Sequence, residues 1–232
     1  MKLSRTNTIL AKMKEQGITH ALVSDPYSIF YLTGFLENPG ERFFAILLDE
    51  NGNHKLFLNI LFPLEEDLGL EIVSYSDTDD IISKVAEYIP DGTKLGIDKI
   101  LPARFLLPLM DKLPKTKFVD VSVLVDTTRM LKDEEEKELM RISSELNDKA
   151  CQFVIDNITE HTTEKDLVKK LLAYYEEIGV EGTSFAPIIA FGDNGANPHG
   201  MPGDRKPKPG ESVIVDIGGI KDKYCSDMTR TV

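Results

Sequence analysis

Two aspartates near the end of the chain have the spacing of a carboxylate pair on neighbouring strands. Apolar and polar residues alternate in Val213–Ile217 and in residues 224–231, and turn-forming glycine, lysine and aspartate lie between them. A hairpin centred on the 221–222 peptide bond places Asp216 directly opposite Asp227. Directly opposed Cβ atoms of antiparallel strands lie about 4.5–5.5 Å apart. The sequence therefore predicts two carboxylates side by side on one face of a hairpin.

Two ionised carboxylates at that distance, with apolar neighbours, repel each other and lose hydration. A shared proton offsets this cost, and so does a bound cation. Two metal ions about 3.5–4 Å apart, bridged by carboxylates, form a known hydrolytic centre. Oxygen ligands favour Mn²⁺ or Mg²⁺, whereas Zn²⁺, Co²⁺ or Fe²⁺ also need imidazole. The other interpretation is that Asp216 ends a strand and Asp227 caps a turn, and the spacing alone leaves both open.

The elements that position this pair begin with an N-terminal region of alternating strands and helices, which is typical of an α/β layer structure. We expect strands at residues 21–25, 43–48, Lys55–Asn59, Glu71–Tyr75, 95–98 and 118–121. We expect helices at residues 4–16, 26–35, 79–88 and 104–112.

The pattern changes near residues 126–132, which predicts a domain of residues 1–128 followed by a second of residues 129–232. Asp133 followed by Glu136 is the signature of a capping box that starts a long helix. We expect three further elements before the hairpin: a second helix that starts at Thr162 or Thr163, a strand at 185–190 and a loop at 192–203. Because the last segment stops without a turn or polar tail, we expect the second domain to be cut short.

Composition narrows the class of partner. Lysine and arginine number 27 against 39 aspartates and glutamates, and the resulting net charge of −12 argues against nucleic acid and anionic membranes. The apolar runs are far shorter than the roughly 18 residues of a membrane span. The two cysteines, Cys151 and Cys225, provide neither a disulfide framework nor a metal knuckle. We therefore expect a reduced, cytoplasmic protein that binds neither nucleic acid nor membrane.

The stretch VIVDIGGIKDKYCSDMTRTV resembles the metal-binding hairpin of the pita-bread metallopeptidases, the family of methionine aminopeptidase, aminopeptidase P and prolidase (Xaa-Pro dipeptidase). The residues that match the family pattern are Asp216, Gly218, Ser226, Asp227, Thr229, Arg230 and Thr231. The loop GDNGANPHGMPGDRKPKPGE and the segment LKDEEEKELMR are also similar to the family. The resemblance implies an α/β (α+β) fold, with a creatinase-type N-terminal domain containing a mixed sheet and an incomplete pita-bread catalytic domain.

The resemblance also implies roles for individual residues. Asp216 would ligate one divalent metal ion and Asp227 would bridge two, with manganese the first choice and cobalt, zinc or iron as alternatives. His199 would act catalytically by contacting the substrate or the tetrahedral intermediate, although a solvated loop histidine is the other interpretation. Thr229 falls on the carboxylate face, either as a hydrogen-bond donor to a metal ligand or as a packing residue. Arg230 falls on the opposite face and receives no role.

Within the family, the chain looks most like Xaa-Pro dipeptidase, a homodimer acting on proline-containing dipeptides or short peptides, with aminopeptidase P as the alternative. The family completes its site with one histidine and two glutamates beyond this hairpin, and none of His20, His54 and His161 matches them. We therefore expect this chain alone to bind metal weakly and to be inactive, and a longer protein to be a metal-dependent Xaa-Pro peptidase. A metal-free binding or dimerisation scaffold, or an N-terminal interaction domain with a stub of enzyme, remain as alternatives.

Overall fold

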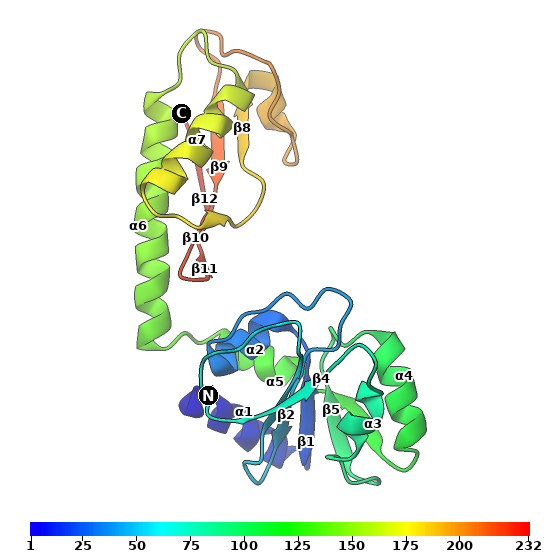
Figure 1. Ribbon diagram of the computed structural model, residues 1–232. Coiled ribbons are helices and arrows are strands. Elements are labelled where there is room, and N and C mark those ends of the chain that lie inside the picture. Colours follow the sequence, from blue (N-terminus) through cyan, green and yellow to red (C-terminus); the bar gives the residue numbers. More distant parts are fainter. The chain divides into compact units, whose positions relative to one another are not determined.

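The computed structural model describes residues 1–232, which divide into two compact units, Met1–Leu131 and Lys132–Val232. The first unit contains a six-stranded sheet in the order β4-β3-β2-β1-β5-β6 (Figure 1). Its strands are β1 (His20–Val23), β2 (Ala45–Asp49), β3 (Lys55–Asn59), β4 (Glu71–Tyr75), β5 (Lys94–Ile97) and β6 (Lys117–Asp120). Strand β2 runs antiparallel to both neighbours, while β1, β5 and β6 are mutually parallel and β4 is parallel to β3. The predicted α/β fold with a mixed sheet is confirmed.

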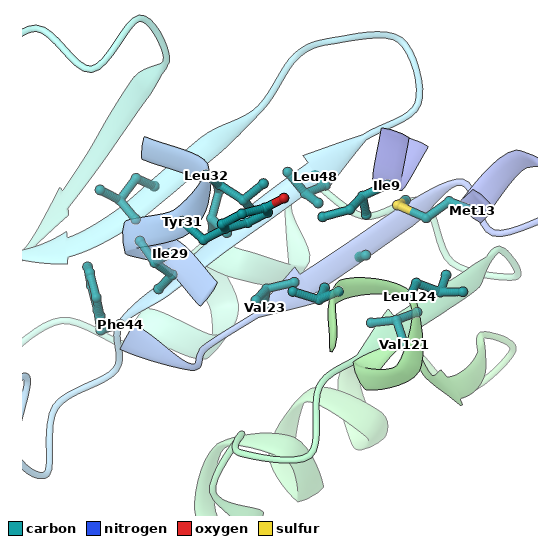
Figure 2. Close-up of a cluster of buried hydrophobic side chains, with 14 of the residues drawn as sticks. Ile9, Met13, Val23, Ile29, Tyr31, Leu32, Phe44, Leu48, Val121 and Leu124 are labelled. Carbon is teal, nitrogen blue, oxygen red and sulfur yellow. The ribbon is translucent and has the colours of Figure 1, made fainter. Parts of the chain in front are cut away.

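Helices cover both faces of this sheet. One face packs against α1 (Leu3–Glu15), α2 (Pro26–Thr33) and α5 (Ser122–Arg129), and the other against α3 (Ile81–Ala86) and α4 (Ala103–Lys112). Figure 2 shows the first of these cores, in which side chains of the helices meet the sheet residues Val23 and Leu48. The unit is therefore a three-layer structure with two apolar cores. Helix α5 lies in a segment for which we predicted no helix.

The second unit places two helices against small antiparallel sheets. The helices are α6 (Glu134–Asp156) and α7 (Glu164–Glu177). The three-stranded sheets have the orders β12-β9-β8 and β11-β10-β7. Their strands are β7 (Gly182–Thr183), β8 (Ile188–Phe191), β9 (Val213–Ile217), β10 (Gly219–Lys221), β11 (Tyr224–Cys225) and β12 (Met228–Thr231), and a 3-10 helix, η1 (Gly192–Ala196), follows β8.

Both helices of this unit begin with a capping box. Asp133 accepts a hydrogen bond from the backbone of Glu136, whose side chain bonds back to the backbone of Asp133, as the sequence predicts. Thr163 and Asp166 form the equivalent pair on α7.

The alternation of side chains along β9 decides which face of its sheet is available for chemistry. Val213, Val215 and Ile217 are buried and belong to the core formed with α6 and α7. Because successive side chains of a strand point to opposite faces, Ile214 and Asp216 lie on the face away from this core. No helix of the structure combines the length and the apolar composition needed to cross a membrane.

Candidate metal centre

The hairpin that carries the two aspartates turns at Asp222 and Lys223, whose φ angles are 49° and 67°. Positive φ at both central residues is the geometry of a two-residue hairpin turn that matches the twist of the strands. Asp216 consequently lies opposite Thr229, so the predicted direct pairing of Asp216 with Asp227 is wrong. The pairing is displaced by two residues, an even number, so each side chain of the paired strands keeps its predicted face.

Asp216 is half-buried and is held by its partner across the ladder. Thr229 Oγ1 donates a hydrogen bond of 2.6 Å to Asp216 Oδ1. The predicted position of Thr229 on the carboxylate face is thereby confirmed. An ionised carboxylate accepts up to about four hydrogen bonds or ligand contacts, so the second oxygen of Asp216 remains available.

Asp227 directly follows Ser226, whose backbone is tightly packed against neighbouring segments. Ser226 N donates to Gly219 O over 2.8 Å, and Ser184 Oγ donates to Ser226 O over 2.7 Å. A Cβ atom at Gly218 would lie 2.1 Å from Ser184 Oγ and 2.3 Å from Ser226 O. The backbone immediately before Asp227 is therefore fixed from two sides, while the Asp227 side chain is exposed.

The strand end that follows Asp216 is held from the α6 side by a buried amide. Asn147 is fully buried; its Nδ2 donates to Ile217 O over 3.0 Å, and its Oδ1 accepts from the Tyr175 hydroxyl over 2.7 Å. Burial raises the pKa of the Tyr175 hydroxyl far above its usual value, which keeps it protonated as a donor. Asn147 was not among the residues predicted from the sequence. The sequence feature that could have indicated it is a polar residue at position 147, on the same face of the helix as the buried Ala150 and Val154.

His199 lies in the loop between β8 and β9. Its side chain is exposed, and its backbone N–H donates to Asn197 Oδ1 over 3.1 Å. The start of the loop lies against the carboxylate face, because a Cβ atom at Gly195 would lie 3.1 Å from Ile214 Cδ1, two residues before Asp216. The structure thus brings the loop of His199 to the same face of β9 as Asp216.

Glu164, which contacts the loop of His199, is a second residue that was not predicted from the sequence. It is fully buried at the first position of α7 and accepts hydrogen bonds from Phe191 N, Asn194 Nδ2 and Gly203 N. Acidic residues are common in the first turn of any helix, so no sequence signal marks this one.

The donor atoms of the site fit part of a divalent metal centre. Two aspartate carboxylates are hard oxygen ligands, which suit Mn²⁺ or Mg²⁺. No group of three or more histidine, cysteine, aspartate or glutamate side chains lies close enough together to hold a metal ion in this structure. Two aspartate side chains alone would offer at most two of the roughly six ligands that such an ion takes.

Comparisons with known proteins identify the family of the chain. The model of the creatinase/prolidase N-terminal domain matches residues 5–131, and that of metallopeptidase family M24 matches residues 138–232. An uncharacterized peptidase of Staphylococcus saprophyticus is 34% identical over 236 residues, which cover 100% of this chain and 66% of the relative.

Solved structures of other proteins are also similar to this chain. The prolidase from Thermococcus sibiricus is 31% identical with a TM-score of 0.88, covering 100% of this chain and 65% of that one. A dipeptidase from Pyrococcus horikoshii is 29% identical with a TM-score of 0.86, covering 98% and 64%. The chain thus spans about two thirds of the length of the curated relatives it matches, 66% in each of the first two. On these grounds the chain belongs to metallopeptidase family M24 and carries a creatinase/prolidase N-terminal domain in front of its M24 segment.

Proposed function

We propose that this chain provides the first two metal ligands and a substrate-contacting loop of a dinuclear-metal peptidase that cleaves Xaa-Pro bonds, with dipeptides as its substrates. The observation that supports this most strongly is the hydrogen bond from Thr229 to Asp216, on a hairpin within the segment that matches family M24. The similar solved structures above are named as a prolidase and a dipeptidase, and these names supply the proposed substrate class.

The roles of the residues follow from their chemistry. Asp216 and Asp227 would hold the metal ions, and Thr229 would orient Asp216 by occupying one lone pair of Oδ1. When bound, such a metal pair lowers the pKa of a bound water and polarises the peptide carbonyl. His199 would donate a hydrogen bond to the substrate carbonyl oxygen, where negative charge develops.

The number of ligands limits what this chain does alone. Two carboxylates leave most of the coordination positions of two metal ions unfilled. We therefore propose that the 232-residue chain binds divalent metal weakly and does not hydrolyse peptides. We expect a form of the relatives' length to bind the metal tightly and to hydrolyse peptides.

Hydrolysis of Leu-Pro tests the proposal. Both forms are assayed with Mn²⁺, alongside Asp216→Asn and Asp227→Asn in the longer form. Asp222→Asn is the matched control, because Asp222 lies in the turn of the same hairpin and asparagine tolerates its positive φ. We expect turnover by the longer form and its control only. Turnover by the 232-residue chain, or by the Asp216→Asn variant, contradicts the proposal.

Peptide length separates the two candidate activities. A dipeptidase cleaves Leu-Pro and leaves a peptide extended beyond the proline intact, whereas an aminopeptidase P cleaves the extended peptide. We expect preference for Leu-Pro, and preference for the extended peptide would replace dipeptidase by aminopeptidase P.

A further inference from the structure

Glu164 is a buried carboxylate that no cation neutralises. It is 0% exposed, and no lysine, arginine or histidine forms a salt bridge with it. A buried charge needs hydrogen bonds to replace its hydration. Glu164 obtains them from uncharged donors only, at 2.8 Å from Phe191 N, 2.7 Å from Gly203 N and 3.0 Å from Asn194 Nδ2 to each oxygen.

These donors bracket the loop of His199. Phe191 ends β8, Asn194 lies in η1, and Gly203 is at the far end of the loop. The backbone of α7 adds a further bond at the far end, because Lys165 N donates to Gly203 O over 3.1 Å. One carboxylate therefore closes the loop 192–203 at its two ends and in its first turn.

Asn194 connects this carboxylate to the turn that carries His199. Its side chain donates to Glu164, and its carbonyl accepts from Asn197 N over 3.2 Å. Asn197 in turn accepts from Gly200 N over 2.9 Å and, through Oδ1, from His199 N over 3.1 Å. The chain of contacts runs without a break from Glu164 to both sides of His199.

We propose that Glu164 is a positioning residue that fixes the loop 192–203, and through it His199, for contact with the substrate. This inference rests on the proposed function for the role of His199, but the fixing of the loop does not. The carboxylate is suited to the task because it accepts on both oxygens. A glutamine keeps the shape but turns one acceptor into a donor that faces a backbone N–H.

Amide hydrogen exchange of the 232-residue chain tests the fixing of the loop. In Glu164→Gln we expect the amides of Phe191 and Gly203 to exchange at least about 10-fold faster, since hydrogen bonds to a buried charge are lost. The matched control is Glu160→Gln, a surface glutamate whose side chain is 82% exposed, and it should leave these rates unchanged. Should Glu164→Gln fail to fold, Asn194→Ala removes the central donor and should loosen residues 194–201. Unchanged exchange in the folded variants overturns the proposal.

A double-mutant cycle in the longer form tests the link to His199. With Leu-Pro and Mn²⁺, Glu164→Gln should lower kcat/KM by about 10-fold in the wild-type background and by less than about 2-fold in His199→Ala. A role unrelated to His199 gives the same loss in both backgrounds and overturns the positioning role. If Glu164→Gln speeds exchange but His199→Ala has no effect on turnover, the proposed role of His199 has failed, and the positioning role fails with it while the fixed loop stands.

Discussion

Gly218 offers the sharpest structural test of the hairpin, through the substitution Gly218→Ala. A Cβ atom there would lie 2.1 Å from Ser184 Oγ, 2.3 Å from Ser226 O and 2.7 Å from Phe185 Cε1. All three distances are well below van der Waals contact. The serine hydroxyl can rotate away, but the Ser226 carbonyl is backbone and moves only if the segment before Asp227 moves with it.

The magnitude follows from two losses. Overpacking a close-packed site costs about 1–3 kcal/mol, and loss of the Ser184 to Ser226 hydrogen bond costs about 1 kcal/mol. We therefore expect Gly218→Ala to lower the free energy of unfolding of the second unit by about 2–4 kcal/mol. The matched control is Gly182→Ala in neighbouring β7, where an added Cβ meets no atom within 4 Å. It should change stability by less than about 0.5 kcal/mol.

Urea unfolding measures the free energy of unfolding of both variants. It should be followed by the NMR signals of residues 213–231, because the two units need not unfold in one transition. With a urea dependence of about 1–3 kcal/mol per M, the midpoint of Gly218→Ala should fall by about 0.7 M or more. If Gly218→Ala and Gly182→Ala have the same midpoint, the close packing before Asp227 is refuted.

Three further predictions concern single side chains. Thr229→Val should weaken Mn²⁺ binding about 10-fold, since it removes the hydrogen bond to Asp216, whereas Thr231→Val on the same strand should have no effect in the same titration. Asn147→Leu should lower the free energy of unfolding by about 2–4 kcal/mol, because Ile217 O and the Tyr175 hydroxyl lose their partner. Urea unfolding measures this, with Gln152→Leu at an exposed position of the same helix as the control. Equal free energies of unfolding in the two variants would contradict the prediction. His54 accepts a hydrogen bond from Asp49 N, and burial lowers its pKa. Because the unfolded state then binds more protons than the folded state, the free energy of unfolding should fall as the pH drops through about 6.5. His54→Asn should reduce this fall between pH 7.5 and 5.5, while exposed His161→Asn should leave it unchanged.

Local sequence patterns predict most of the first unit, because its strands are short apolar runs between turn residues. The bounds of β3 and β4 agree with the prediction to the residue. Helix α5 could not be found this way, since its sequence SVLVDTTR is rich in β-branched residues with low helix propensity. Leu124 and Val125 are buried in the core shared with α1, so tertiary packing stabilises this helix.

The faces of the hairpin were predictable from the sequence, but the register of its strands was not. The positions of Asp216 and Thr229 on one face follow from alternation, which a displacement of two residues preserves. The displacement itself arises from a turn that uses Asp222 and Lys223 at positive φ, where glycine or asparagine would have signalled it. The buried bonds of Asn147 and Glu164 join segments far apart in the chain, and no local pattern encodes them.

Binding of Mn²⁺ to the 232-residue chain is the most direct test of the central claim that Asp216 and Asp227 hold a divalent ion. Paramagnetic Mn²⁺ broadens the NMR signals of nearby amides, and the spectrum reports the position of the ion without any catalysis. We expect amides of residues 214–218 and 227–231 to broaden first, and this selectivity to disappear in Asp216→Asn and Asp227→Asn but to persist in Asp222→Asn. Uniform broadening across the chain, or the same broadening in all three variants, would contradict the metal centre.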